Sequence, residues 1–547
     1  MTNPTTPTGF AVHGSLPQRG LDITPSSTSY NGRYGRMFRD LPTYDIKDDS
    51  LVALSRVMVQ QLEDGKLDKP LGEVDDDENT ARLGDELRLP AGYTYFGQFV
   101  DHDITFDPIS SLSRQNDPDA LTNFRTPRFD LDSLYGRGPS DQPYMYAEDG
   151  VHLVEGDPSG PQAGTNGPDL PRARNGRAII GDPRNDENLI VSQLQVAMIR
   201  FHNHVADEVF AHSPGWSPDD VFKKTQQIVR WHYQWIVVND FLPRLVGESV
   251  VDDILKPAPY ESSPDTEVTI PKPNFRFYHW RNEPYMPLEF AVAAYRYGHS
   301  QIRPSYLLND VAVGQPPIDG VSRITVFLQN DEELQSLNGF RRLPNFWGVQ
   351  WKFFLHHITG SDPDNTDLPQ PSYKLDATIA HPLGALNRQA AEPQQVASGF
   401  SPTIAQSLAV RNLLRGKRLN LPSGQDVARA MGIPPLTDEE LFVGVQLDAE
   451  VRRDLAGRAP LWYYVLKEAE VVGQAAQLGP VGGRIVAEVL VGLLVGDSLS
   501  YFNVEPNWRP FLASREHGHF TLSDLINFAI PAVAAPAQAA ADRTQNA

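Results

Sequence analysis

The strongest constraint on the fold is a pair of long segments, residues 188–210 and 219–242, whose apolar side chains recur at the spacing of an amphipathic helix. Shorter segments with this spacing occur at residues 51–62, 461–499 and 522–533. The alternation of apolar and polar residues that is typical of strands is sparse. Because no linker-like segment divides the chain, the sequence predicts a mainly α protein with one large domain and few short strands.

The two ends of the chain differ in composition from this central part. Residues 1–40 are rich in Pro, Ser, Thr, Gly and Arg, which is typical of an extended segment. Residues 534–547 are rich in Ala, with Gln and Pro, and predict a flexible tail. We therefore expect an N-terminal arm over residues 1–40, a folded domain over residues 41–533 and a C-terminal tail over residues 534–547.

The charge balance restricts the partners of the protein. The 547 residues carry a formal net charge of −21, and the sequence pI is about 5.1. Nucleic acids and anionic membranes are polyanions, which proteins meet with Lys and Arg, so neither is expected as the main partner. Small diffusible molecules fit this composition better.

The absence of cysteine excludes several kinds of site. The chain has no disulfide framework, no thiolate nucleophile, and no thiolate ligand for zinc, an iron–sulfur cluster or haem iron. The N-terminus lacks the basic start and apolar run of a conventional secretory signal. The longest apolar stretch, residues 485–496, is too short to span a membrane and contains Glu488. We expect no transmembrane segment, and a location either in the cytoplasm or outside the cell by another export route.

A short segment, residues 95–103, concentrates polar chemistry among aromatic residues. In a helix, Gln98 and His102 would lie four residues apart on one face, with Asp101 beside them. Apolar neighbours would bury this face, and buried carboxylates such as Asp103 need a cation, a hydrogen bond or a covalent link. The same pattern fits a capped helix start with a solvated acidic corner, so the segment alone leaves both explanations open.

Oxygen-bearing side chains alternate in residues 126–136. Thr126, Asp130 and Asp132 would place their oxygens on one side of an extended loop, which suits a hard cation that prefers six to eight oxygen ligands. The alternative is a polar turn before Tyr135.

Residues 181–188 combine a Gly-Asp-Pro sequence with Arg184 and Glu187, just before a long helical pattern. The Gly-Asp-Pro sequence is typical of helix entry, and this alone would explain the segment.

Two later segments carry the remaining candidate residues. Residues 295–300 place His299 after an apolar helical run, where a lone histidine is more often structural than a metal ligand. Residues 410–418 form a basic cluster around Asn412, which could equally be a solvated patch.

Taken together and in this order, these motifs resemble those of the animal-type haem peroxidases, members of the peroxidase–cyclooxygenase superfamily. The resemblance covers most of the chain apart from the arm and the tail. It implies a large, single, mainly α peroxidase domain over residues 41–533. Because secreted animal members carry disulfides and this chain has no cysteine, we expect a bacterial member.

The resemblance implies roles for the polar residues. His102 would be the general base that moves the proton of hydrogen peroxide, and Arg184 would stabilise the departing oxygen. Gln98 would neighbour a bound halide. The reaction would pass through a ferryl intermediate that is reduced by small phenolic donors, halides or thiocyanate.

The resemblance also implies a haem b cofactor. His299 would be the axial ligand of the iron, and Asn412 would accept the N–H of its imidazole. Asp101 and Glu187 are the candidates for ester links to haem methyl groups. Asn188 stands where some relatives have a methionine bonded to the haem, so no sulfonium link is expected.

A calcium site is implied as well. Its ligands would be Asp103, Thr126, the carbonyl of Arg128, Asp130 and Asp132, and its role would be to hold the segment that carries His102.

Two other functions remain open. A fatty-acid dioxygenase of the cyclooxygenase type needs a radical tyrosine three residues before the axial histidine, and Arg296 occupies that position. Tyr295 or Tyr297 could take that role in a shifted register, and residues 278–280 (Tyr-His-Trp) imitate the dioxygenase motif. A haem-binding adhesion protein without catalysis is the other alternative, although such a protein has no need of Gln98, His102 and Arg184 together.

Overall fold

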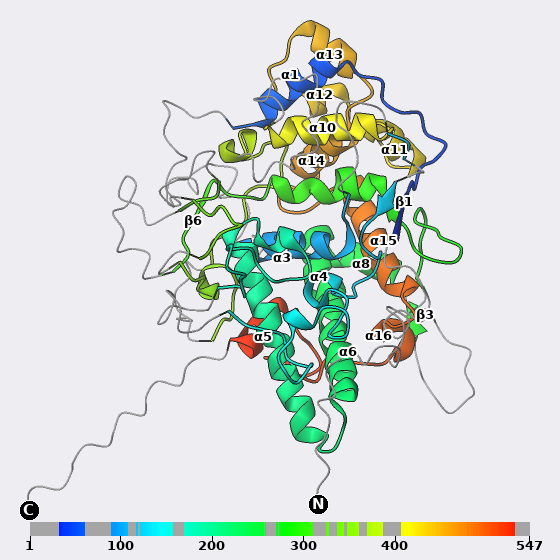
Figure 1. The fold of residues 1–547 in the computed structure, drawn as a ribbon. Coiled ribbons are helices and arrows are strands. Elements are labelled where there is room, and N and C mark those ends of the chain that lie inside the picture. Colours follow the sequence, from blue (N-terminus) through cyan, green and yellow to red (C-terminus); the bar gives the residue numbers. More distant parts are fainter. Residues whose placement is uncertain are drawn as a thin grey trace, which may run out of the picture.

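The computed structural model describes residues 32–60, 89–107, 116–118, 121–156, 169–255, 257–258, 270–271, 273–309, 324–327, 336–343, 347–359, 369–386 and 406–530. In these residues the fold is mainly helical (Figure 1). Buried apolar residues from Tyr34 to Ala529 form one core cluster. The predicted fold class, mainly α with few short strands, is confirmed.

Long and short helices make up most of this structure. The α-helices are α1 (Asp48–Met58), α3 (Ala91–Ile104), α4 (Asp132–Tyr135), α5 (Leu189–His212), α6 (Pro218–Ile236), α7 (Leu242–Val246), α8 (Glu248–Ile254), α10 (Leu408–Arg418), α11 (Gly424–Ala430), α12 (Asp438–Leu441), α13 (Ala449–Leu455), α14 (Leu461–Val471), α15 (Pro480–Gly496), α16 (Tyr501–Val504) and α17 (Leu522–Ala529). The 3₁₀-helices are η3 (Pro143–Met145), η4 (Pro183–Asp186), η7 (Ala294–His299), η9 (Trp351–Phe353) and η10 (His381–Gly384). Two segments, η5 (Val237–Phe241) and η6 (Glu289–Ala293), are π-helical.

The strands are short. They are β1 (Gly32–Gly35), β2 (Thr122–Asn123), β3 (Pro257–Ala258), β4 (Ile270–Pro271), β5 (Met286–Pro287), β6 (Ser305–Tyr306) and β7 (Ile324–Thr325). Strand β1 pairs antiparallel with β2 and parallel with β5, with Gly32 opposite Asn123 and Tyr34 opposite Met286. Strands β3 and β4, and strands β6 and β7, form antiparallel pairs.

Helices α5 and α6 pack against each other and extend together from the lower side of the molecule (Figure 1). The Asn188 side chain caps α5 by accepting from the Ile190 N–H at 3.0 Å. Ser217 caps α6, and Pro218 occupies its first turn, where a missing N–H costs nothing. Helix α6 continues through η5 into α7. Both long predicted helices are therefore present, and the second is longer than its pattern indicates.

Helix α3 lies in the centre of the fold, below η6 and η7 and below α10 in the view of Figure 1. It packs against α5, and Phe96 and Phe99 meet the Tyr233 ring edge-on at 6.0 and 6.1 Å. At its N-terminus, the N–H groups of Ala91 and Gly92 donate to backbone carbonyls of other segments at 2.9 Å each. Ring contacts along one face and hydrogen bonds at the N-terminus therefore fix the position of α3.

The predicted helical segment at residues 461–499 is two helices, α14 and α15. The chain turns between them at Gly473–Gly479, where Gln474 and Ala475 adopt left-handed φ values of 56° and 57°. Pro480 then begins α15. Both helices share the same apolar periodicity, so the sequence pattern does not reveal the break between them.

The predicted arm and tail fall largely outside the described residues, which begin at residue 32 and end at residue 530. The domain limits at residues 41 and 533 remain predictions. In the part of the chain that is described, no helix is both long and apolar enough to cross a membrane.

Candidate active site

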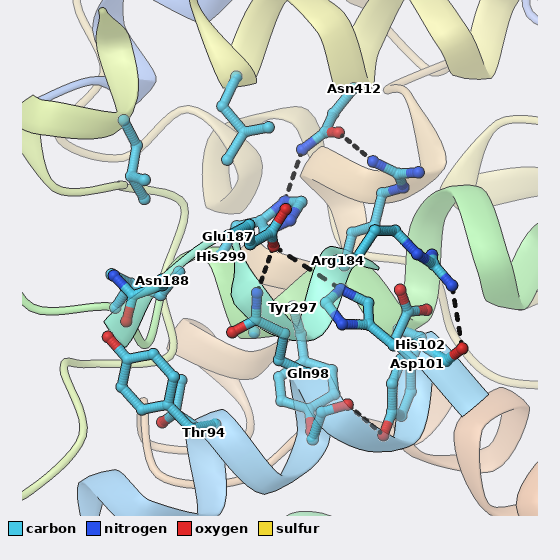
Figure 2. A pocket seen from close by; sticks show the side chains of 18 of the residues that line it. Thr94, Gln98, Asp101, His102, Arg184, Glu187, Asn188, Tyr297, His299 and Asn412 are labelled. Atoms are coloured by element: carbon cyan, nitrogen blue, oxygen red, sulfur yellow. Dashed lines mark hydrogen bonds and ion pairs between the residues drawn. The ribbon is translucent and has the colours of Figure 1, made fainter. Parts of the chain in front are cut away.

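One cavity of about 350 Å³ brings the predicted residues together (Figure 2). It lies between α3, the segment around η4, η7 and α10. The predicted residues that line it are Gln98, Asp101, His102, Arg184, Glu187, His299 and Asn412. Segments that are far apart in the sequence therefore meet at one site.

The face of α3 that carries the polar residues turns toward this cavity. Gln98 and Asp101 are the two α3 residues that are only partly buried, as expected for side chains that face a cavity. Because α3 begins at Ala91, this motif lies well inside the helix. The alternative of a capped helix start is therefore wrong.

His102 is a neutral imidazole with a defined partner. Its Nδ1 lies 2.7 Å from the Oδ1 of Asn185, which can only accept, so the ring proton is on Nδ1. Its Nε2 lies 3.7 Å from an Oε1 of Glu187. Burial, with the nearby Arg184 guanidinium, lowers the pKa of His102 to about 3. The Nε2 atom therefore keeps its lone pair over the whole physiological pH range.

Arg184 is held at the cavity by carbonyl groups and a carboxylate. Its Nη2 donates to the backbone carbonyls of His102 at 2.9 Å and Thr105 at 2.6 Å, and its Nε and Nη2 donate to Asp182. The guanidinium lies over the Phe106 ring at 4.6 Å. Among the described residues Nη1 has no hydrogen-bond partner, so Nη1 is the nitrogen that can donate to a bound group.

Asp182, which the sequence prediction omitted, fixes this arginine. Its fully buried carboxylate accepts from Arg125 as well as from Arg184, and it caps η4 by accepting the Arg184 backbone N–H at 2.8 Å. Although burial alone would raise it, the two guanidinium groups hold the pKa of Asp182 below its usual range. The Gly-Asp-Pro sequence indicates the cap, but no sequence signal indicates the pairing with Arg125.

Asp101 and Glu187 reach the cavity from different elements. The Nε2 of Gln98 donates to the Oε1 of Glu187, as Figure 2 shows. The Oδ1 of Asp101 accepts from the Thr105 hydroxyl at 3.0 Å. Burial raises the pKa of Asp101 even though Arg184 opposes this shift. Both carboxyl groups therefore border the space where a cofactor would lie.

His299, at the end of η7, contacts Asn412 as predicted, but the direction of the bond is reversed. The Nδ2 of Asn412 lies 2.8 Å from the Nδ1 of His299, and its Oδ1 accepts from the Nη1 of Arg296 at 2.7 Å. A guanidinium can only donate, so it takes the amide oxygen and leaves the amide nitrogen for the imidazole. The prediction that Asn412 accepts the imidazole N–H did not consider Arg296.

The backbone that presents His299 is irregular. The π-helix η6 changes directly into the 3₁₀-helix η7, and Ala293 at the junction has φ −129° and ψ −75°. The buried carboxylate of Glu289 in η6 accepts the N–H groups of Met37 and Phe38 at 3.0 Å each. The apolar run of residues predicted a regular α-helix here. The sequence does not distinguish the two, because π- and 3₁₀-helical turns contain the same types of residue as an α-helix.

The walls of the cavity fit haem. Burial, together with Arg296 and Arg411, lowers the pKa of His299 to about 3, so this imidazole is neutral. Metal binding through Nε2 would require the ring proton on Nδ1 and the Asn412 amide turned so that its oxygen faces Nδ1. Arg411 and Arg415 lie one turn apart on α10 and are buried in the cavity wall. The apolar lining residues are Ile302, Phe327, Phe340, Leu383, Leu386 and Leu408. A neutral imidazole, apolar walls and two guanidinium groups suit a flat apolar ring with anionic substituents.

The predicted cation ligands meet beside α3. One carboxylate oxygen from each of Asp103, Asp130 and Asp132 lies within 4.8 Å of the others, and Thr126 donates to Asp130 at 2.5 Å. Burial and Asp130 raise the pKa of Asp103 to about 7, and burial raises that of Asp132. The Oδ1 of Asp132 is buried without a hydrogen-bond partner among the described residues. Buried carboxylates with a partnerless oxygen fit a bound hard cation.

Arg128 lies in the same loop, and its backbone N–H donates to the Thr126 carbonyl at 2.8 Å. The role of its carbonyl as a ligand remains a prediction. Leu131, with a left-handed φ of 57°, turns the chain so that its N–H donates to Asp103 at 3.3 Å. The Ser133 hydroxyl donates to Asp103 at 3.1 Å. The sequence prediction missed this contact because Ser133 is outside the alternating pattern.

The segment that imitates a dioxygenase motif lies outside the cavity. The hydroxyl of Tyr278 donates to the Tyr285 carbonyl at 2.6 Å, and the Nε2 of His279 lies 3.2 Å from the Arg276 carbonyl. Neither Tyr278 nor His279 lines the cavity. These residues have structural roles.

This chain is similar to known haem peroxidases. A family model described as animal haem peroxidase matches residues 113–344. Chorion peroxidase of Drosophila melanogaster is 24% identical over 326 residues, which cover 59% of this chain and 34% of that protein. The matched part therefore spans about a third of the length of this curated relative.

Solved structures show the same fold. Peroxidase A of Dictyostelium discoideum is similar with a TM-score of 0.54 and 14% identity, and the match covers 96% of both chains. The fatty acid α-dioxygenase of Oryza sativa is similar with a TM-score of 0.55 and 16% identity, and the match covers 87% of this chain and 77% of that chain.

The helical fold of this chain is that of these solved structures. Residues 113–344 match the animal haem peroxidase family model, and chorion peroxidase is similar over 59% of this chain. The expectation of a bacterial member remains a prediction.

Proposed function

We propose that this protein is a peroxidase that holds haem b in the cavity between α3 and η7, reduces hydrogen peroxide and oxidises small donors. The observation that carries this proposal is that His102, Arg184 and His299 line one cavity. Burial, with nearby guanidinium groups, keeps both imidazoles neutral. One imidazole can therefore accept a proton while the other binds iron.

His102 and Arg184 act on peroxide. The Nε2 of His102 accepts the proton of one peroxide oxygen and delivers it to the other, which departs as water. The Nη1 of Arg184 stabilises the negative charge that develops on the departing oxygen, an effect that is large where water is excluded.

The other cavity residues hold the cofactor. His299 would bind the haem iron, and Asn412, which is bonded to Arg296, would orient its ring. Arg411 and Arg415 suit the propionates. When bound, haem supplies the iron centre at which peroxide is reduced.

Asp101 and Glu187 are the candidates for ester links to haem methyl groups. Each link would replace a methyl C–H bond by a C–O bond, and the reduction of one hydrogen peroxide to two waters would balance this two-electron oxidation. After peroxide treatment, haem should resist acid–butanone extraction from the parent protein. It should be extracted from a variant with Asp101→Asn and Glu187→Gln. Free extraction from the parent would exclude the links.

We infer that the cluster of Asp103, Thr126, the Arg128 carbonyl, Asp130 and Asp132 binds calcium. Support comes from its three carboxylates, of which those of Asp103 and Asp130 are buried, and from its position against α3. The ion would be structural, because it neutralises charge next to His102 and ties α3 to the loop before α4.

The donors we propose are phenols, bromide, iodide and thiocyanate. Gln98 lies one helical turn before His102 and faces the same cavity, so it is the candidate neighbour of a bound halide. Its amide already donates to Glu187, which leaves one N–H for this purpose.

Steady-state oxidation of a phenolic donor and of iodide by the haem-loaded protein tests this function. His102→Ala should lower the peroxide-dependent rate by about 10²–10⁴ and leave haem binding unchanged. His204→Ala is the matched control, because His204 lies outside the cavity and bonds to the Phe528 carbonyl at 2.9 Å. A His102→Ala variant as active as the parent would refute the proposal and favour a non-catalytic haem protein.

A fatty-acid dioxygenase is the second candidate. The apolar cavity wall and the presence of Tyr295 and Tyr297 in the lining favour it. Arg296 stands where a radical tyrosine is needed, which favours the peroxidase. Oxygen uptake with palmitate separates the two functions, and uptake without added peroxide would support the dioxygenase.

A further inference from the structure

A buried chain of two amides connects His102 to helix α5. The Oδ1 of Asn185 lies 2.7 Å from the Nδ1 of His102, and the Nδ2 of Asn185 donates to the Oε1 of Gln195 at 2.8 Å. Both amide side chains are fully buried. The distal imidazole is therefore linked through two hydrogen bonds to a second helix.

Both amides are carried by helical elements that pack against one another. Asn185 lies in η4, where its N–H donates to the Asp182 carbonyl at 3.1 Å. Gln195 lies in the second turn of α5, which packs against both η4 and α3. Gln195, held in this packing, takes the amide nitrogen of Asn185 and leaves its oxygen for His102.

The hydrogen bonding of Gln195 indicates that its side-chain oxygen orients Asn185. Its Nε2 is buried and has no hydrogen-bond partner among the described residues. A buried donor without a partner is unfavourable, and such groups are few in native proteins. The side chain of Gln195 keeps this orientation, with its Nε2 donor unsatisfied, because its oxygen accepts the hydrogen bond that orients Asn185.

We propose that Asn185 and Gln195 are positioning residues that fix His102 in the tautomer with its proton on Nδ1. The kinetic consequence rests on the proposed peroxidase function: Nε2, the atom that faces the cavity, is then free to accept the proton of peroxide. An amide oxygen achieves this without placing another charge beside Arg184 and Asp182.

The tautomer can be measured directly. Protein labelled with ¹⁵N-histidine is studied by NMR in the diamagnetic ferrous carbonyl form, or without haem where none is bound, and His102→Gln assigns the signal. The parent should show protonated Nδ1 and unprotonated Nε2. Asn185→Leu, which is similar in size but has no acceptor, should lose this preference, and Asn185→Asp, which keeps the acceptor, should retain it. A parent protein with the proton on Nε2, or an Asn185→Leu variant with an unchanged tautomer, would overturn the proposal.

The kinetic consequence needs its own control. Asn185→Leu should slow the reaction of haem-loaded protein with peroxide by about 10–100-fold, the effect typical of residues that orient a functional histidine. Asn203→Leu also removes a buried amide, one that bonds to Leu153 far from the cavity, and should leave the rate within about twofold. Equal rates for the two variants would contradict the positioning role. A parent protein without peroxide reactivity would refute the proposed function and leave the tautomer result standing.

Discussion

At the residue scale, Asp182 is the group on which the arrangement of Arg184 depends. One fully buried carboxylate pairs with two guanidinium groups, those of Arg125 and Arg184. These groups also bind the His102 carbonyl, at 3.2 Å for Arg125 and 2.9 Å for Arg184. Asp182 therefore fixes the backbone of the proposed base as well as the arginine above it.

Replacing Asp182 by Asn should destabilise the protein strongly. Both guanidinium groups would keep their charge in a buried site, and breaking such a pair typically costs about 3–5 kcal/mol. Urea unfolding of the haem-free protein measures this loss. Asp149→Asn, which removes a half-exposed ion pair with His152, should cost less than about 1 kcal/mol. A loss below about 1 kcal/mol for Asp182→Asn would contradict this role.

The kinds of residue at the site could be predicted, but their bonding could not. His102, Arg184 and His299 belong to motifs whose residue types and order are distinctive. The orientation of Asn412 depends on Arg296, which is distant in the sequence and meets it only in the folded chain. Asn185 stands next to Arg184 in an expected motif, but an asparagine near a helix start has too many structural uses to signal a role.

At the element scale, the joint between α14 and α15 depends on one buried carboxylate. The Oε2 of Glu468 accepts the N–H groups of Val481 and Gly482 at 2.9 and 3.1 Å, which satisfies the start of α15. Burial raises the pKa of Glu468 to about 7, even though these hydrogen bonds lower it. The helix start is therefore capped by a group that resists ionisation.

Glu468 should make stability depend on pH. Its pKa is about 7 in the folded protein against 4.5 for an ordinary glutamate, so the folded state binds more protons between these values. Stability should therefore fall as pH rises from about 4.5 to 7, by roughly 2–3 kcal/mol at most. Unfolding of Glu468→Gln across this range should show a smaller fall than the parent. Identical pH profiles for the two proteins would exclude this effect.

The link between α3 and α4 should depend on calcium. Chelation with EGTA should lower the melting temperature by several degrees, because a ligand at 100 times its Kd contributes about 2.7 kcal/mol. Calcium should restore stability and magnesium should not, because magnesium prefers smaller, hydrated sites. An Asp132→Ala variant should no longer respond to either treatment. A parent protein indifferent to EGTA, and free of bound calcium by metal analysis, would contradict the site.

Long regular elements could be predicted, whereas irregular ones could not. Helices α5 and α6 show in the sequence because their apolar stripes are long and their caps are ordinary. The change from π to 3₁₀ helix before His299 has no such signal, since it is imposed by packing against α14, α15 and α3.

At the scale of the whole molecule, the formal net charge of −21 produces a negative electrostatic potential around the protein. Charged electron donors approach the cavity through this potential. An overall negative protein repels anions at long range, and salt weakens this repulsion as the screening length shortens. The mainly α class could be predicted at this scale, because it follows from sums of local patterns. The limits of the domain could not, because they depend on contacts between distant segments.

Salt should therefore affect donors according to their charge. Raising ionic strength from about 10 mM to about 200 mM should increase kcat/KM for iodide a few-fold and leave that for a neutral phenol unchanged. Initial rates at saturating peroxide measure this. A decrease for iodide would show that local positive charge, such as that of Arg411 and Arg415, outweighs the net charge.

The most direct test of the central claim is the absorption spectrum of haem-loaded protein after rapid mixing with one equivalent of hydrogen peroxide, for the parent and for His102→Gln. We predict rapid conversion of the parent to one new spectral species, and conversion at least about 100-fold slower in the variant. Equal rates in the two proteins, or haem that peroxide only bleaches, would contradict the assignment of His102 as the base and of the cavity as a peroxidase site.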